Sequence, residues 1–353
     1  MTAPALSIRG LRRAYGPICA LDGIDLDVGN DELVVVLGPT GAGKTTLLRS
    51  IAGLDAPDAG SVHLRGEEAT HWSPARRDVS LVFQNFSLYP EWTVERNLAF
   101  PLRAPARRLS DGEISERIAW ASELLRIGHL LHRPAQHLSG GEMQRVAIGR
   151  AIVRRPFLFL MDEPLTNLDA KLREELRVEL VVLRRELRIP MVYVTHDQSE
   201  AMSMGDRLLV LSKGRILQEG TPHAIYHYPA SEAVGVQLGE PKINVIPVEQ
   251  RDSHWSAPGG EQLLPVTGAR PERMLMGVRP EWLRPEGGNS TGTVRLVEDT
   301  GPALVLAVDW LVGQQLIYLL VEKGGRAWKP GDKIDPDIDP ERIILWPLTG
   351  QMA

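Results

Sequence analysis

The hydrophobic positions in the first two thirds of the chain form short apolar runs separated by segments of helical period. The strands that this pattern predicts lie at 6–12, 18–28, 33–37, 157–161, 191–194 and 207–211. The helices that it predicts lie at 44–52, 171–187 and 198–204. Strands that alternate with helices in this way predict one α/β domain.

The remaining segments differ from this pattern in amino-acid composition. Residues from about 86 to 155 are rich in helix-favouring residues with Arg and Glu, which predicts a helical insertion in the α/β domain. After about residue 235 Pro and Gly become frequent, and short alternating stretches follow at 293–297, 303–310 and 314–321. We therefore expect an α/β domain over 1–236 and a small all-β, barrel-like domain over 237–353.

Composition narrows the class of protein without identifying it. The 353 residues carry a formal net charge of -5, so no general basic surface for nucleic acid is expected. No apolar run approaches the ~20 residues of a membrane helix, and residues 1–6 lack the pattern of a secretory signal. Cys19 is the only cysteine, which excludes an internal disulfide and a cysteine-cluster metal site. A cytoplasmic location is expected.

The most specific chemical signal follows the predicted strand at 33–37. The segment Gly38-Pro39-Thr40-Gly41-Ala42-Gly43-Lys44-Thr45 matches the phosphate-loop pattern GxxxxGK[ST]. Its glycines let backbone N–H groups curl around a β-phosphate, and Lys44 adds a charge for the β and γ oxygens. Thr45 supplies the hydroxyl expected on Mg²⁺, and Thr46 is the next donor at the helix start. A nucleoside triphosphate with Mg²⁺ is therefore expected, and the motif by itself is compatible with many nucleotide-binding families.

Two acidic residues follow the predicted strand at 157–161. Asp162 is expected to hold Mg²⁺ through water, and Glu163 is placed to polarise the attacking water as a general base. Acidic pairs after strands are common and usually solvated, so this pair is a weak signal by itself. Its position after a third motif, Leu138-Ser139-Gly140-Gly141-Glu142, strengthens it. Small residues that open a helix expose N–H groups able to grip a γ-phosphate.

These three motifs, in this order, resemble the ATPase of an ATP-binding cassette (ABC) transporter. The resemblance implies a P-loop cassette in which two chains sandwich two ATP molecules head to tail. Glu142 stands where the family more often has Gln, which leaves the phosphate-gripping residues intact. The residues that the resemblance places against nucleotide on a second subunit are Ser139, Gly140, Gly141, Glu142 and Asp169.

Three further residues acquire roles through the resemblance. Tyr15 resembles the aromatic that stacks on adenine, and Gln84 resembles the glutamine that touches Mg²⁺ and the attacking water. His196 resembles the switch histidine that contacts the γ-phosphate. Taken singly, each also fits an ordinary core or surface residue. The implied catalytic set is Glu163, His196 and Gln84, acting by positioning and charge stabilisation.

The resemblance covers nearly the whole chain and is closest to the maltose-type, or carbohydrate-uptake class 1, importer ATPases. It rests on segments 83–90, 163–173 and 193–202, and on Gly277-Val278-Arg279-Pro280-Glu281. The last string resembles the marker of a C-terminal, TOBE-like barrel with regulatory and dimerising roles. Where the family usually continues with His-Met after residue 90, this chain has Glu91-Trp92. The resemblance implies that this segment faces a membrane subunit, so the change is expected to concern the partner and to leave catalysis alone.

The implied function is ATP hydrolysis that drives uptake of a solute, a sugar or a glycerol-type polyol. The implied partners are a second copy of the chain or a related ATPase, two transmembrane permease subunits and, indirectly, an extracytoplasmic solute-binding protein. The implied location is the cytoplasmic face of the inner (plasma) membrane, where the chain is peripheral. A polyamine, iron or sulfate importer stays open, because the ATPase does not touch the cargo.

Two alternatives belong to other classes of function. A soluble, non-transport cassette ATPase usually carries two cassettes or long coiled coils, and neither pattern is present in the sequence. A regulatory module that binds ATP without turnover requires a damaged base or switch, whereas Glu163 and His196 are both present.

Overall fold

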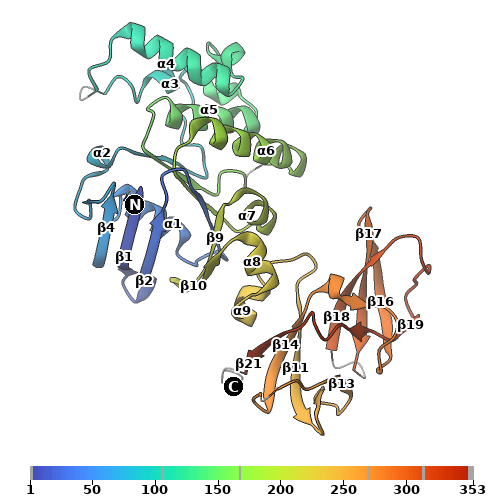
Figure 1. Ribbon diagram of the computed structural model, residues 1–353. Helices are drawn as coiled ribbons and strands as arrows, with labels where there is room; N and C mark the ends of the chain where they lie inside the picture. Colours follow the sequence, from blue (N-terminus) through green and yellow to red (C-terminus); the bar gives the residue numbers. More distant parts are fainter. Residues whose placement is uncertain (1–2, 105–106, 167, 269, 312–314, 349–353) are drawn as a thin grey trace. The chain divides into compact units, whose positions relative to one another are not determined.

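The computed structural model divides the chain into two compact units, Met1–Pro222 and His223–Ala353 (Figure 1). The structure describes residues 3–104, 107–166, 168–268, 270–311 and 315–348. The boundary between the units precedes the expected one at 236/237. Part of the intervening segment bonds to the second unit, since the Pro229 carbonyl accepts a hydrogen bond from Trp346 Nε1 at 2.8 Å.

A six-stranded sheet, in the order β10-β9-β3-β8-β7-β6, forms the centre of the first unit. Its strands are β3 (Leu33–Leu37), β6 (Val79–Val82), β7 (Leu158–Asp162), β8 (Met191–Thr195), β9 (Arg207–Ser212) and β10 (Arg215–Gly220). All pairings are parallel except that of β10 with β9. β3, β7 and β8 are buried along their whole length, which explains their nearly continuous apolar sequences.

A second, antiparallel sheet, in the order β2-β1-β4-β5, shares the core of the first. Its strands are β1 (Leu6–Tyr15), β2 (Ile18–Val28), β4 (Ala59–Leu64) and β5 (Glu67–Glu68). Leu47 and Ile51 of α1 (Lys44–Ala52) lie in the same hydrophobic cluster as Ile8 of β1 and Val36 of β3. The helix that begins at the phosphate loop is therefore packed against both sheets.

The helices of the middle segment gather at the end of this unit opposite β1, β2 and β4 (Figure 1). They are α3 (Val94–Ala99), α4 (Asp111–Leu124) and α5 (Gly140–Ile152). The short α2 (Pro74–Arg77) precedes β6, while α6 (Ala170–Leu187) and α7 (Gln198–Met204) follow β7 and β8. Among the described residues, no helix combines the length and the apolar character needed to span a membrane.

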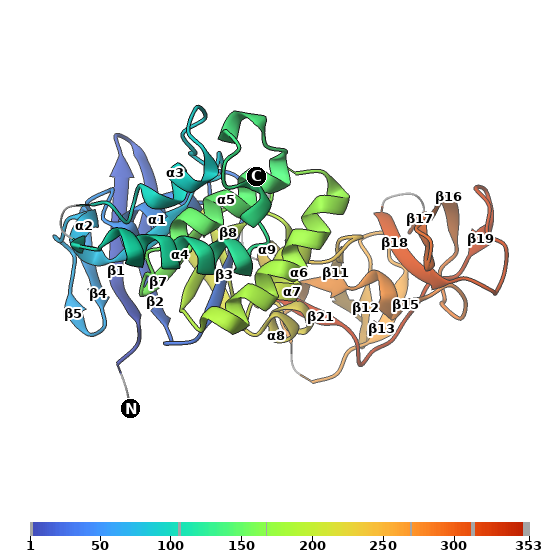
Figure 2. The same ribbon diagram turned by 90° about the horizontal axis from the view of Figure 1, so that it is seen from above.

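The second unit is built almost wholly from strands, after the short α8 (Pro222–His227) and α9 (Glu232–Gly235). It contains a five-stranded sheet, β13-β12-β11-β14-β21, a four-stranded sheet, β18-β17-β16-β19, and the pair β15-β20 (Figure 2). The bounds are β11 (Asn244–Arg251), β12 (His254–Ser256), β13 (Gln262–Pro265), β14 (Arg273–Val278), β15 (Leu283–Arg284), β16 (Gly292–Asp299), β17 (Ala303–Trp310), β18 (Gln315–Glu322), β19 (Lys333–Ile334), β20 (Asp337–Ile338) and β21 (Ile344–Pro347). Trp255 and Trp310 are buried in one core that all three sheets share. The predicted small all-β fold is confirmed.

The contacts of Arg279 give the segment 277–281 a structural role. This side chain is 0% exposed, and its guanidinium donates hydrogen bonds to the carbonyls of Tyr226, Gly235 and Leu238. The guanidinium also lies 3.9 Å from the centroid of the Tyr226 ring. The arginine thereby ties the segment 226–238 to the rest of the second unit.

Candidate catalytic site

The phosphate loop joins the end of β3 to the start of α1. Gly43 precedes α1 with a φ of 106°, a left-handed conformation that glycine adopts without strain. A Cβ at Gly38 would lie 2.3 Å from the Leu211 carbonyl oxygen, and one at Gly43 would lie 2.3 Å from that of Ala20. Both positions therefore exclude side chains. The loop can then present backbone N–H groups at the helix start, and this cradle fits a phosphate.

Lys44 lies inside this loop. Its side chain is 5% exposed and its Nζ lies 3.1 Å from Oε1 of Glu163. Nζ also donates to the carbonyl oxygens of Gly38, at 2.9 Å, and Pro39, at 3.1 Å. A buried ammonium requires such partners, because it has lost most of its hydration. Its positive charge is consequently held at the centre of the loop.

Asp162 is the last residue of β7 and accepts a hydrogen bond from Thr45 Oγ1 at 3.1 Å. Burial raises the pKa of Asp162, and the hydrogen bond from Thr45 opposes this rise. A hydroxyl beside a carboxylate provides the hard oxygen ligands that Mg²⁺ prefers, so these two residues fit the cation. Gln84 is exposed just past the end of β6, the neighbour of β7, and therefore belongs to the same edge of the sheet.

Glu163 has both carboxylate oxygens engaged. Its Oε2 lies 2.8 Å from His196 Nδ1 and accepts from Thr166 Oγ1 at 3.4 Å, while Oε1 faces Lys44. Burial raises the pKa of Glu163, but Lys44 and His196 together outweigh burial, so the net pKa lies below the ordinary value. The carboxylate is therefore ionised at neutral pH, as a general base must be. Its backbone has a φ of 45°, in the left-handed region that is strained for a residue with a side chain.

The parallel order of β3, β8 and β7 explains why these residues meet. Gly38 N donates to the Thr195 carbonyl at 3.4 Å, and Glu163 N donates to the Val194 carbonyl at 3.0 Å. The end of β8 thus lies between the phosphate loop and the end of β7, and carries His196 between them. The residues that the structure brings together, called the catalytic cluster below, are Lys44, Thr45, Asp162, Glu163 and His196.

Ser139 begins α5 with a capping box. Its Oγ accepts from Glu142 N at 3.4 Å, and its own N–H donates to Glu142 Oε2 at 2.7 Å, which lowers the pKa of Glu142. Gly141 has a packing role, because a Cβ there would lie 2.8 Å from Cδ2 of Leu172 in α6. Within the described part of the chain, no hydrogen bond joins Ser139 to the catalytic cluster.

Tyr15 ends β1, and its side chain is 44% exposed. Its hydroxyl donates to Asp55 Oδ2 at 2.7 Å, and the same oxygen lies 2.7 Å from Arg49 Nε of α1. The ring is thus tethered to the helix that follows the phosphate loop.

Asp169 caps α6 by accepting from Leu172 N at 3.0 Å, whereas its neighbour Asn167 lies outside the described residues.

Sequence reasoning missed two side chains that support the catalytic cluster. The Thr166 hydroxyl reaches Glu163, and the buried Glu200 accepts hydrogen bonds behind His196. Thr166 lies within the segment 163–173, but nothing in its local pattern predicts a contact with Glu163. Glu200 gives no local signal, because its partners become apparent only when β8 and α7 are folded together.

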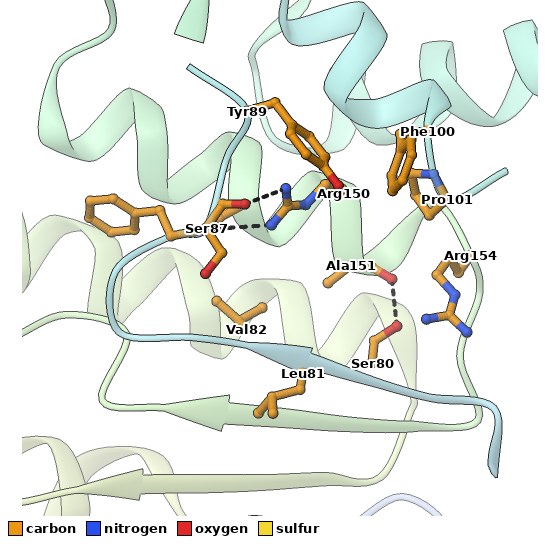
Figure 3. Close-up of a pocket in the computed structure, with 12 residues that line it drawn as sticks. Ser80, Leu81, Val82, Ser87, Tyr89, Phe100, Pro101, Arg150, Ala151 and Arg154 are labelled. Atoms are coloured by element: carbon orange, nitrogen blue, oxygen red, sulfur yellow. Dashed lines mark hydrogen bonds between the residues drawn. The ribbon is translucent and has the colours of Figure 1, made fainter. Parts of the chain in front are cut away.

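A groove of about 250 Å³ lies between β6, the segment 86–101 and α5 (Figure 3). In this β6–α5 groove, Arg150 donates to the carbonyls of Ser87, at 2.7 Å, and Phe86, at 3.0 Å. The exposed rings of Tyr89 and Phe100 also line it. Trp92, the unusual residue of this segment, stacks on Tyr89 with ring centroids 4.2 Å apart. Trp92 therefore extends an aromatic cluster beside the groove.

The class of protein follows from this geometry. A phosphate loop, two carboxylates at a strand end and a histidine at the next strand end define a P-loop ATPase cassette. Comparisons with known proteins agree: a family model described as ABC transporter matches residues 21–166, and a TOBE domain model matches residues 276–346. The chain belongs to the ATP-binding cassette transporter family.

Relatives match over most of their length. The sn-glycerol-3-phosphate import ATP-binding protein UgpC of Ralstonia nicotianae is 43% identical over 329 residues, which cover 89% of each chain. The protein of the same name from Cupriavidus metallidurans is 43% identical over 96% of this chain and 95% of its own. An uncharacterized ABC transporter ATP-binding protein of Bacillus subtilis, YurJ, is 37% identical over 99% of both chains.

Solved structures match the cassette. An ABC transporter cassette in its ADP conformation has a TM-score of 0.59 and 26% identity, covering 66% of this chain and 98% of its own. A nucleotide-free cassette has a TM-score of 0.56 and 27% identity, covering 62% of this chain and 91% of its own. The chain is therefore a transporter ATPase whose cofactors are ATP and Mg²⁺.

Proposed function

We propose that this ATPase drives uptake of sn-glycerol 3-phosphate or a closely related glycerol- or sugar-type solute. The observation that carries the ATPase part is the double engagement of Glu163, with Oε1 on Lys44 and Oε2 on His196. The solute is proposed from relatives whose names describe sn-glycerol-3-phosphate import.

Each member of the catalytic cluster has a separate task in this proposal. Glu163 accepts the proton of the attacking water, and His196 holds Oε2 of Glu163 and faces the γ-phosphate. Lys44 and the loop amides bind the phosphates, while Thr45, Asp162 and Gln84 hold the cation. A Mg²⁺ ion held by these residues would supply positive charge to offset the negative charge that develops on the phosphates. Tyr15 offers its exposed ring to the adenine.

A second subunit completes the site in this proposal. Ser139, Gly140, Gly141 and Glu142 open α5 with N–H groups at the positive end of the helix. These residues have no hydrogen bond to the catalytic cluster of their own chain, among the residues described. We assign them, with Asp169, to nucleotide held by a second copy or a related ATPase. Hydrolysis then depends on closure of the pair.

The β6–α5 groove is the proposed contact with a permease subunit, one of the two transmembrane permease subunits proposed as partners. Gln84 stands between the end of β6 and the segment that forms the aromatic wall, so it can relay movement of the groove to the site. In this proposal the chain lies peripherally on the cytoplasmic face of the inner membrane, and a solute-binding protein acts indirectly. The all-β unit is assigned to regulation and dimerisation.

Uptake in cells tests the proposal. Cells whose own copy carries Lys44→Ala are expected to lose uptake of ¹⁴C-labelled sn-glycerol 3-phosphate, while cells with Lys329→Ala, an exposed lysine of the second unit, keep it. Labelled maltose, putrescine and sulfate are measured in parallel. Loss of uptake of one of these three instead would overturn the proposed solute, and unchanged uptake of all four solutes would overturn it as well.

A further inference from the structure

A buried carboxylate lies behind His196, where the mechanism so far has no use for it. Glu200, in the first turn of α7, is 3% exposed. Its Oε2 accepts hydrogen bonds from Tyr193 OH at 2.8 Å and from Thr195 Oγ1 at 2.7 Å. Burial raises the pKa of Glu200, and the two hydroxyl donors oppose the rise. Burial of a carboxyl group costs free energy unless hydrogen bonds replace its lost hydration, and the two hydroxyl groups supply such bonds here.

Thr195 connects the buried carboxylate of Glu200 to the turn that carries His196. A hydroxyl has one proton, and Thr195 directs it to Glu200. The Thr195 lone pairs are then free to accept from Asp197 N, which lies 2.9 Å from Oγ1. Thr195 and Asp197 are the two neighbours of His196 in the chain. The turn is thus held on both sides of the histidine.

The same turn is attached to the rest of the site. The Thr195 carbonyl accepts from Gly38 N of the phosphate loop at 3.4 Å. Asp197 Oδ1 accepts from Glu200 N at 3.1 Å, which closes a ring of contacts between the turn and α7. His196 Nδ1 then meets Glu163 Oε2 at 2.8 Å. A continuous series of hydrogen bonds and covalent links therefore runs from Glu200 to the base.

We propose that Glu200 is a positioning residue for hydrolysis, which holds the His196 ring against Glu163 by way of Thr195. The inference rests on the proposed role of His196. Without the carboxyl acceptor, the Thr195 hydroxyl rotates and the turn loosens, so the ring leaves Glu163. The turnover rate falls, whereas ATP binding, which depends on the Lys44 loop, is retained.

Paired substitutions in the purified chain separate this role from general destabilisation. Glu200→Met removes the acceptor and keeps the length of the side chain, whereas Glu200→Gln keeps a carbonyl oxygen. Thr195→Val removes the hydroxyl at the same shape, whereas Thr195→Ser keeps it. Glu219→Met, at an exposed position of β10, is the matched control.

The substitutions are expected to change the turnover rate and to leave the affinity for ATP nearly unchanged. Glu200→Met and Thr195→Val lower kcat by roughly tenfold to a hundredfold, the effect of a misplaced catalytic group, and leave the Kd for ATP within about twofold. Glu200→Gln and Thr195→Ser recover most of the lost kcat. If circular dichroism shows that Glu200→Met is unfolded, the result for Thr195→Val decides whether the positioning role stands.

A double variant supplies the sharpest test. In single-turnover hydrolysis, Glu200→Met adds no further loss in a His196→Ala background, because its effect passes through that histidine. Full additivity, a wild-type rate in Glu200→Met and Thr195→Val, or an equal loss of ATP affinity overturns the inference. A wild-type rate in His196→Ala overturns instead the proposed role of His196, together with all that rests on it.

Discussion

Nζ of Lys44 and Oε1 of Glu163 lie 3.1 Å apart, so the cation of the phosphate loop and the proposed base share one ion pair. Their side chains are 5% and 15% exposed. Removal of either charge leaves the other poorly solvated and without its partner. Binding and hydrolysis are therefore coupled through this pair, although substitutions of the two residues are expected to differ in effect.

Lys44→Ala is expected to weaken ATP binding itself. The substitution removes the ammonium for the β- and γ-phosphates and leaves the Glu163 carboxylate to repel them, so the Kd should rise by at least about tenfold. Isothermal titration of ATP with Mg²⁺ measures this change. Lys329→Ala, an exposed lysine of the second unit, is the control, and equal affinity in the two variants would refute the assigned role of Lys44.

The pH dependence of turnover should report the lowered pKa of Glu163. A base with a lowered pKa stays ionised as the pH falls, so the acid limb of kcat/KM, which reports the free enzyme, lies below the ordinary pKa of a glutamate. The linked stability is present above the unfolded pKa and is lost as the pH falls through the folded one. His196→Gln removes one cause of the lowering, so the limb should move to higher pH.

Values of kcat/KM for His196→Gln across the acid range check this shift, with His223→Gln in the second unit as the control. A limb at the same pH in wild type and His196→Gln would show that His196 does not support the ionised base.

Arg77 should support α1 from outside the catalytic site. The side chain is 2% exposed, and its guanidinium donates to the carbonyls of Ser50, Ile51, Thr70 and Trp72. Arg77→Leu leaves these carbonyls without that donor, which should destabilise α1 by about 3 kcal/mol. Hydrogen exchange of the α1 amides measures this loss, with β17 of the second unit as an internal reference. Unchanged exchange in α1 would contradict the assignment.

Ser139→Ala should separate ATP binding from assembly. The substitution removes an N-cap, with a local cost of about 1 kcal/mol, and alters the helix end proposed to face a second nucleotide. ATP-dependent dimerisation, followed by light scattering, should be lost while the single chain still binds ATP. Ser110→Ala removes an equivalent capping box from α4 and should leave dimerisation intact. Equal behaviour of the two variants would argue against the in-trans role.

Motifs that are contiguous in the chain could be read from the sequence. The predicted strands at 18–28 and 33–37 and the helix at 44–52 coincide with β2, β3 and α1, since apolar runs and glycines mark their ends. The positions of Asp162 and His196 at the site also follow from buried strands whose ends are polar, because neighbouring parallel strands present such ends at one edge.

Contacts between distant segments could not be read in this way. Arg77 sits in a short helix with no motif, and its acceptors lie on α1 and the loop before α2. The buried state of Glu200 contradicts the usual exposure of glutamates and depends on two hydroxyls of β8. The packing of Gly141 on Leu172 likewise depends on how α5 meets α6. Each is a property of the tertiary arrangement.

Glu163→Gln tests the central claim most directly, because it removes the base and keeps the shape of the side chain. We expect steady-state phosphate release to fall by roughly a hundredfold or more, while ATP binding survives and light scattering shows an ATP-dependent dimer that persists. Phosphate release equal to that of the wild type would contradict the assignment of Glu163 as the base. The absence of any ATP-linked dimer would contradict the shared site between two subunits.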